Sequence, residues 1–229
     1  MGFTIGSIRD IRDITPGARP WRRTRGSVRA TIAEYTGRHG WAVAPGARAA
    51  RGGGSCSCGD TECPAPGAHV LRFADEIPAG ATPEEVEEAW SLTPGAAVML
   101  PVGRTFDVLD VAEEAGCRAL VRLERMGLRL GPVLATPAGR ALFFVAPGAA
   151  EELPQLLYRM GWDGTGLDLC CLGLGEYITA PPSDRGGLGP VRWLRPPGGT
   201  AAQPPEARLL LGALAYVGHR HRTGMPVRA

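Results

Sequence analysis

The sequence predicts an α+β fold in which helices flank a mixed, largely antiparallel sheet and a Cys/His loop binds a metal ion. Short apolar runs alternate irregularly with amphipathic segments, with hairpins among them, and this pattern favours a mixed sheet over a doubly wound parallel one. Three of the six cysteines fall in one loop rich in glycine and proline. The chain has 229 residues and is 44% hydrophobic, so it can bury a substantial core.

The helices are predicted from apolar periodicity and from capping residues. Ser27 is a cap ahead of the first amphipathic segment. The segment Thr82-Pro83-Glu84-Glu85 combines a cap, a first-turn proline and acids that favour the positive end of a helix. The predicted helices cover residues 27–37, 82–90, 113–126, 153–160 and 209–219.

The strands are predicted from short apolar runs bounded by glycine and proline. The two runs on either side of Gly103 are expected to pair with each other, and a hairpin is expected around Pro137. The predicted strands cover residues 41–45, 97–101, 106–111, 133–136, 141–145, 167–171, 177–180 and 191–193.

The charge of the chain is carried on its basic side by arginine alone. No lysine is present, all 25 basic residues are arginine, and the formal net charge is +2. A GC-rich coding bias explains the same excess of Arg, Gly and Pro, so composition supports nucleic-acid binding only weakly. Residues 1–26 end in an arginine cluster beside Trp21, which predicts either a solvated tail or a basic arm that contacts phosphate.

Targeting and membrane signals are not recognisable in the sequence. The N-terminus has no continuous apolar segment of the secretory type. No stretch approaches the roughly 20 apolar residues that a membrane span requires. We therefore expect a cytoplasmic protein without membrane association, and in that compartment clustered cysteines more often bind metal than form disulfides.

The most specific motif is a Cys/His cluster in which three thiols and one imidazole fall within fourteen residues. This set suits tetrahedral Zn²⁺, and because all four ligands come from the protein, the predicted role is structural. The loop is too polar and too short to bury a core, so the metal would supply folding energy. The alternatives are free cysteines or a disulfide such as Cys58–Cys63. The predicted ligands are Cys56, Cys58, Cys63 and His69.

Several further motifs follow one another along the chain in a fixed order. They are Gly40-Trp41-Ala-Val-Ala-Pro45, the loop ending at His69, Phe106-Asp107-Val-Leu-Asp110, Gly139-Arg140-Ala-Leu-Phe-Phe144, and Leu167-Asp168 followed by Tyr177-Ile-Thr-Ala-Pro-Pro-Ser183. In this order the motifs resemble the N-terminal prim-pol domain of bifunctional DNA primase/polymerases, in the archaeo-eukaryotic primase superfamily. The resemblance spans roughly residues 28–195.

The resemblance implies two packed α/β parts with an active site on an open, mostly antiparallel sheet. It also implies DNA-templated nucleotide polymerisation by two-metal phosphoryl transfer, with Mg²⁺ or Mn²⁺ as the ions of an active enzyme. The domain boundaries that it implies are a basic arm at 1–26, a prim-pol-like domain at 27–196 that includes the zinc loop at 54–70, and a linker and C-terminal helix at 197–229.

The family pattern has three carboxylates. This chain matches the first and the third, and the second is missing. Asp110 falls where the first carboxylate belongs, and Asp168 matches the third acid. Two residues after Asp110, where side chains share a face of the strand, the second carboxylate is replaced by Ala112. Glu113 is the remaining candidate, but it reaches the site only if a β-bulge re-aims it. The alternative interpretation of Asp110 and Asp168 is structural, as a turn acid or helix cap.

The histidine that contacts the triphosphate in the family is also missing. It is expected at about 141 or 142, where this chain has Ala141 and Leu142. The candidate nucleic-acid- or nucleotide-binding residues are Arg140, Arg104, Ser183 and Arg185.

Three functions follow as hypotheses. The favoured one is a primase/polymerase-like protein with a degraded two-metal site, which binds nucleotide or nucleic acid with little catalysis. The alternative is an active primase/polymerase that uses Asp110, Glu113 and Asp168. The second alternative is a zinc-containing protein-interaction module. Because no helicase P-loop is recognisable, we expect the protein, in a role such as DNA replication, either to work alone or to use a protein partner.

Overall fold

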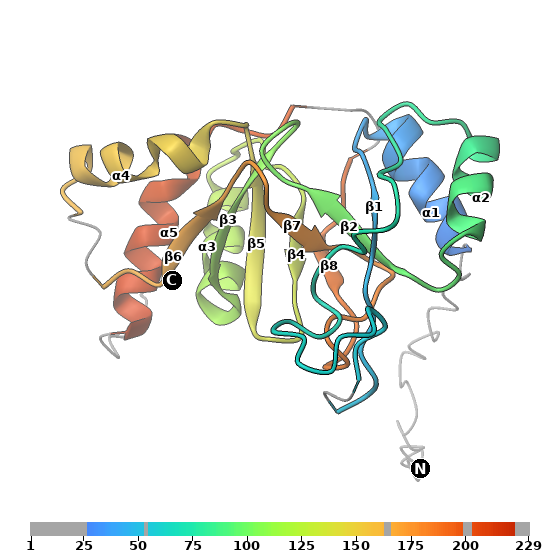
Figure 1. The fold of residues 1–229 in the computed structure, drawn as a ribbon. Coiled ribbons are helices and arrows are strands. Elements are labelled where there is room, and N and C mark those ends of the chain that lie inside the picture. Colours follow the sequence, from blue (N-terminus) through green and yellow to red (C-terminus); the bar gives the residue numbers. More distant parts are fainter. Residues whose placement is uncertain (1–26, 53–54, 163–165, 199–202, 223–229) are drawn as a thin grey trace, which may run out of the picture.

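The computed structural model describes residues 27–52, 55–162, 166–198 and 203–222. The predicted basic arm at 1–26 lies outside the described residues. In the described part the chain is an α+β structure with two antiparallel sheets, as predicted. Figure 1 shows the sheets side by side, with α1 and α2 on the right and α3, α4 and α5 on the left.

The larger sheet has five strands in the order β6-β3-β5-β4-β8, and every neighbouring pair is antiparallel. Its strands are β3 (Asp107–Ala112), β4 (Val133–Ala135), β5 (Arg140–Val145), β6 (Leu169–Leu172) and β8 (Arg192–Arg195). One face of this sheet, represented by Leu109 and Phe143, packs against three helices. They are α3 (Glu113–Arg125), α4 (Ala149–Arg159) and α5 (Ala207–Arg222). The predicted hairpin is confirmed as the β4–β5 pair.

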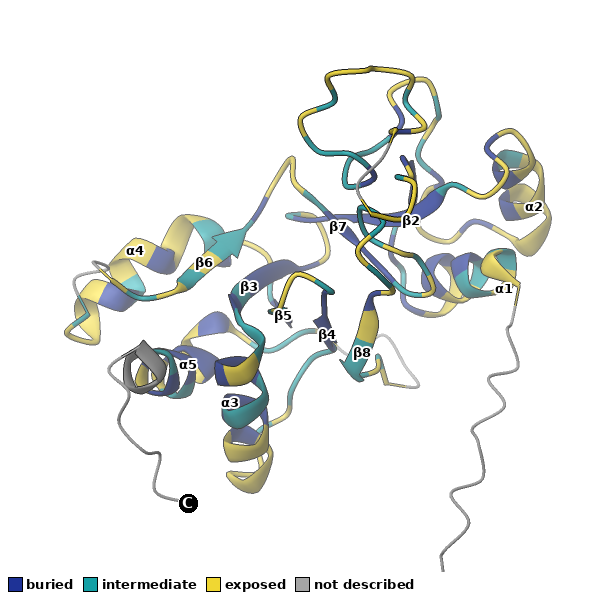
Figure 2. Ribbon diagram, turned by 90° about the horizontal axis from the view of Figure 1, so that it is seen from below, coloured by how far each residue is buried: buried dark blue, intermediate teal, exposed yellow. Residues whose placement is uncertain are grey.

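The smaller sheet has three strands in the order β1-β2-β7 and carries the second core. Its elements are β1 (Ala44–Gly46), β2 (Ala97–Pro101) and β7 (Tyr177–Thr179), with α1 (Val28–Ala33) and α2 (Pro83–Ser91) beside them. Trp41, Phe106 and Phe144 join the two sheets, because the Trp41 ring centroid lies 5.4 Å from each phenyl centroid. Figure 2 shows the buried residues concentrated in the strands, whereas the loop between β1 and α2 is largely exposed.

One predicted strand pairing is wrong. The runs on either side of Gly103 do not pair with each other, because β2 lies between β1 and β7 whereas β3 lies between β5 and β6. The chain crosses from one sheet to the other at Gly103, whose φ of +90° and close approach to the Leu174 backbone exclude a side chain. The first predicted strand is also shifted, since it spans Ala44–Gly46 rather than 41–45.

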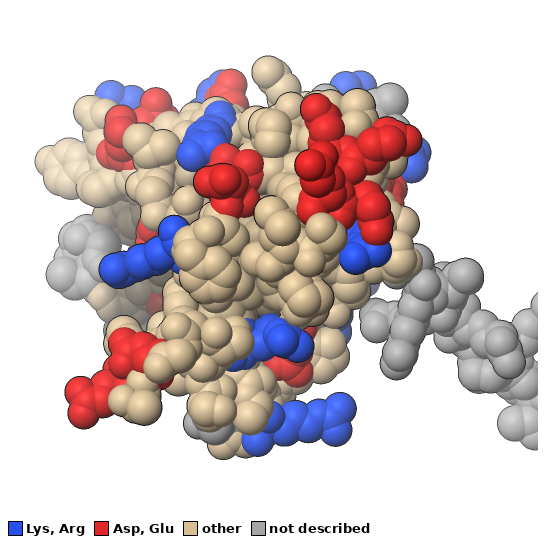
Figure 3. All heavy atoms as spheres, turned by 45° about the vertical axis from the view of Figure 1, so that its right-hand side comes forward, with Lys and Arg blue, Asp and Glu red and all other residues tan. Residues whose placement is uncertain are grey.

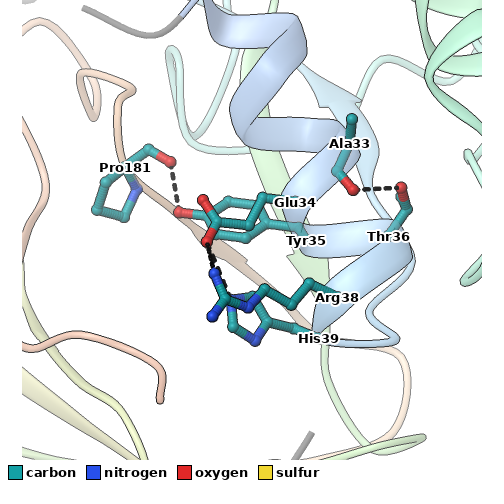
Figure 4. Close-up of polar contacts among 7 residues, drawn as sticks. All are labelled: Ala33, Glu34, Tyr35, Thr36, Arg38, His39 and Pro181. Atoms are coloured by element: carbon teal, nitrogen blue, oxygen red, sulfur yellow. Dashed lines mark hydrogen bonds and ion pairs between the residues drawn. The ribbon is translucent and has the colours of Figure 1, made fainter. Parts of the chain in front are cut away.

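The first helix is confirmed, with Ser27 accepting a hydrogen bond from the Ala30 N–H. Its last turn widens into a π-helix, η1 (Glu34–Arg38). Figure 4 shows the Tyr35 hydroxyl donating to the Pro181 carbonyl, at 2.7 Å, while Glu34 faces Arg38 and His39. Burial raises the pKa of Tyr35, so the hydroxyl remains a hydrogen-bond donor. This contact fixes the start of the loop at 181–190.

Helix α2 carries the predicted cap at Thr82, and the structure adds a capping box in which the side chains of Thr82 and Glu85 each accept a hydrogen bond from the other's backbone N–H. Helix α4, in contrast, begins at Ala149 rather than at 153 and has no side-chain cap of its own. Its cap is supplied by β3: Asp107 is buried, and its Oδ2 accepts a hydrogen bond from the Ala150 N–H at 2.9 Å. The early helix start therefore depends on a contact that is distant in the sequence.

No helix in the described part of the chain is both long and apolar enough to cross a membrane.

Replacing Asp107 with Ala should destabilise the domain by about 1–2 kcal/mol, because it removes a cap and a negative charge from the N-terminus of α4. Urea unfolding followed by circular dichroism measures this loss. The matched control is Asp75→Ala, which removes an exposed aspartate from a loop. Equal stability of the two variants would show that Asp107 does not cap α4.

Candidate functional site

Asp110 and Asp168 lie next to each other on the larger sheet. Asp110 is on β3, where its neighbours across the ladder are Cys170 on β6 and Leu142 on β5. Asp168 immediately precedes β6. The side chain of Asp110 is 19% exposed and that of Asp168 is 53% exposed. The structure therefore places the two matching acids on adjacent strands, one largely buried and one at the surface.

Arg140 lies between the two carboxylates. It is the first residue of β5 and is paired with Ala112, which shares a strand face with Asp110. Its Nε donates to Asp110 Oδ1 at 2.7 Å, and its Nη1 donates to Asp168 Oδ2 at 2.8 Å. Charge-assisted hydrogen bonds of this length are among the stronger polar interactions in proteins. A guanidinium therefore bridges the two acids where a metal ion would bridge them in a two-metal site.

Burial and neighbouring charges shift the pKa values of several groups in and beside this Asp–Arg–Asp cluster. Burial raises the pKa of Asp110, although the charges of Arg140 and Arg185 act to lower it. Burial and the Asp110 charge likewise raise the pKa of the Cys170 thiol. A thiol held in its protonated form is a poor nucleophile, so Cys170 does not have the properties of a reactive cysteine.

Two of the predicted binding residues lie in the loop at 181–190. The positive charge of Arg185 acts to lower the pKa of Asp110, so the Arg185 guanidinium lies near the cluster. Ser183 has a structural contact instead, because its Oγ accepts a hydrogen bond from the Val98 N–H at 2.7 Å. Ser183 therefore attaches the loop to β2.

Glu113 and Arg104 lie away from the bridge made by Arg140. The pairing of β3 with β5 is continuous through Ala112, so no bulge turns Glu113 toward Asp110. Glu113 instead begins α3 and forms an ion pair with Arg192 of β8. Arg104 precedes β3, at the opposite end from Ala112, and forms an ion pair with Glu76.

The four predicted metal ligands do converge on one point. The ligand atoms of Cys56, Cys58, Cys63 and His69 all lie within 4.8 Å of one another. His69 Nε2 is 3.4 Å from Cys56 Sγ and 3.3 Å from Cys63 Sγ. Tetrahedral zinc, with bonds of about 2.0 Å to nitrogen and 2.3 Å to sulfur, requires similar separations. All six cysteines are free, so the disulfide alternative is wrong, and the cluster could bind zinc.

The surroundings of the Cys/His cluster also suit a metal. His69 Nδ1 lies 2.8 Å from the Val70 carbonyl and donates to it, which leaves Nε2 as the ligand atom. Burial acts to raise the pKa of Cys56, but backbone N–H groups of Cys58 and Gly67 outweigh it and lower the pKa to about 6. The Cys56 thiolate, which is the metal-binding form, is thus stabilised before any ion binds.

The Cys/His loop supports the loop at 181–190 through backbone contacts. The Gly186 N–H donates to the Gly67 carbonyl at 3.2 Å. A Cβ at Gly187 would lie 2.2 Å from the Ala50 carbonyl oxygen, so a side chain does not fit there. The Cys/His loop and the loop that carries Arg185 are therefore packed against each other through their backbones.

The bridging role of Arg140 is a feature that the sequence interpretation missed. Arg140 was predicted to bind nucleotide, whereas its side chain contacts Asp110 and Asp168. The sequence does indicate that Arg140 begins a strand of a hairpin. It does not indicate that Arg140 lies opposite Ala112, because that pairing depends on the β3–β5 register. The proximity of Cys170 to Asp110 depends on the β3–β6 register in the same way.

The two antiparallel sheets and the Cys/His loop define an α+β protein with a candidate metal-binding loop. The family model described as the N-terminal domain of bifunctional DNA primase/polymerase matches residues 32–207, which is most of the chain. The chain therefore belongs to the bifunctional DNA primase/polymerase N-terminal (Prim-Pol) family. Comparisons with curated proteins and with solved structures gave no match.

Purified protein should contain about one zinc per chain, because four ligands from a single loop close the coordination sphere. Cys63→Ser should lose most of the zinc and unfold at lower temperature, since metal binding and folding are coupled. Metal analysis and thermal unfolding measure the two effects. Cys117→Ser is the matched control because Cys117 is a partly buried residue of α3 outside the cluster. Wild-type protein that folds without metal would contradict the assignment.

Proposed function

We propose that this Prim-Pol family member binds nucleotide or nucleic acid and has a two-metal site that no longer assembles. The main support is the bridge from Arg140 to Asp110 and Asp168. The guanidinium already occupies the position between the two carboxylates and offsets part of their negative charge, so a further cation at the same place would bind less tightly.

The residues around the bridge do not fit two divalent ions. Two-metal catalysis requires several carboxylates that converge on one point. On the face that carries Asp110, the next strand position is Ala112 and the neighbour on β5 is Leu142. Glu113 is engaged by Arg192. We therefore derive no catalytic step through Mg²⁺ or Mn²⁺ and assign the domain a binding role.

The charge distribution supports phosphate binding near Arg140 and Arg185 rather than over α2. Helix α2 carries Glu84, Glu85, Glu87 and Glu88. Figure 3 shows acidic side chains gathered on the part of the surface where α2 lies. Such a surface repels phosphate. The loop at 181–190, in contrast, brings Arg185 close to the edge of the sheet where Arg140 lies.

Template-directed primer extension should remain at background with either Mg²⁺ or Mn²⁺, because the carboxylates required for transition-state stabilisation do not converge. The same preparation should bind a labelled oligonucleotide, with an affinity that falls as salt rises. Asp110→Ala is the control for the assay: extension that this substitution abolishes would overturn the proposal.

Removing the guanidinium should restore cation binding. Arg140→Ala leaves two neighbouring carboxylates without a counter-ion, so its affinity for Mn²⁺ should rise on the order of tenfold over wild type. Electron paramagnetic resonance of free Mn²⁺ measures this directly. The matched control is Arg192→Ala, which removes an arginine from β8 that contacts Glu113 instead. An unchanged affinity in Arg140→Ala would show that the guanidinium does not replace a metal.

A further inference from the structure

A cleft of about 610 Å³ separates the Cys/His loop from the beginning of β7. Cys58, Cys63 and His69 line it on the loop side, and Tyr177 lines it on the β7 side. Arg72 and Phe73 also line this cleft. Its size falls within the range of small-molecule and cofactor pockets, and it is distinct from the bridge formed by Arg140.

Phe73 is held at the mouth of the cleft by a tight turn. The Ala74 N–H donates to the Leu71 carbonyl at 3.1 Å, and both Leu71 and Ala74 pack in a small core with Ala47 and Cys56. The turn is thereby anchored at both ends, and Phe73 is 74% exposed between them. A phenyl ring so exposed is accessible to a ligand in the cleft.

The aromatic rings of the cleft are available to a ligand. Within the described residues, neither Phe73 nor Tyr177 stacks on another aromatic ring, in contrast to the aromatic cluster around Trp41. Arg72, beside Phe73, is exposed and forms no ion pair in the described part of the chain. An exposed phenyl ring and a half-buried tyrosine ring beside an arginine match the chemistry of unpaired nucleobases joined by phosphates.

The β7 wall of the cleft includes Gly175 and Tyr177. The Cys/His loop forms the opposite wall, and Arg72 is the arginine that lines the cleft itself. A strand whose bases enter the cleft would therefore have a phosphate near Arg72.

We propose that this cleft binds unpaired bases of single-stranded nucleic acid by stacking on Phe73 and Tyr177, with Arg72 contacting the adjoining phosphate. The proposal rests on the proposed nucleic-acid-binding function and specifies where the strand lies. It also gives the Cys/His loop a role beyond folding, because the loop forms one wall of the site.

Two fluorescein-labelled ligands test the stacking directly: a twelve-residue oligo(dT) and a strand of equal length with abasic sites throughout. Binding is measured by fluorescence anisotropy. Phe73→Ala should weaken the binding of oligo(dT) by about tenfold or more, because stacking requires bases. The same substitution should change the binding of the abasic strand only slightly. Tyr158→Ala is the matched control, since Tyr158 is 79% exposed on α4 and does not line the cleft. Phe73→Trp should retain affinity and show emission quenched by unlabelled oligo(dT) but not by the abasic strand.

The outcomes separate this proposal from the function on which it rests. If wild-type protein binds neither ligand, both proposals fail. If wild type binds oligo(dT) and Phe73→Ala binds it equally well, the stacking site is wrong and the nucleic-acid-binding function stands. An equal loss of affinity for both ligands in Phe73→Ala would also overturn base stacking, because the ring would then act on the backbone or on the fold.

Discussion

The position of β3 between β5 and β6 is the constraint on which the candidate site depends. Because the β3–β5 register is continuous, Arg140 lies opposite Ala112 and its guanidinium reaches Asp110 across the ladder. Asp168 immediately precedes β6, which pairs with the other edge of β3, and the same guanidinium therefore reaches that acid as well. A shift of one residue in either pairing would turn these side chains to opposite faces. The charge bridge is thus a product of the strand register.

The Cys/His loop depends on a different kind of constraint. Its small core around Cys56 and Leu71 is too limited to stabilise it alone, so a bound metal would complete its folding. The Gly186 N–H donates to the Gly67 carbonyl and thereby connects the Cys/His loop to the loop that carries Arg185.

The motif that most strongly marks the family is structural in this chain. In the segment at 177–183, the Pro181 carbonyl accepts from Tyr35 and the Ser183 Oγ accepts from Val98 N–H, so the motif joins η1, β2 and β7. A framework of this kind rests on many contacts, whereas two-metal chemistry rests on a few carboxylates. The contacts of this segment with η1 and β2 do not involve Ala112 or Leu142, which neighbour Asp110 on its strand face and on β5.

Local chemistry made part of this protein predictable from its sequence alone. The helix cap at Thr82, the hairpin around Pro137 and the convergence of the Cys/His ligands all involve residues close in the sequence, so their spacing determines their geometry. The crossing of the chain at Gly103, the capping of α4 by Asp107 and the bridge from Arg140 were decided only by the tertiary structure. Each of these joins segments whose relative position depends on sheet order, and sheet order is set by the burial of two whole cores rather than by local pattern.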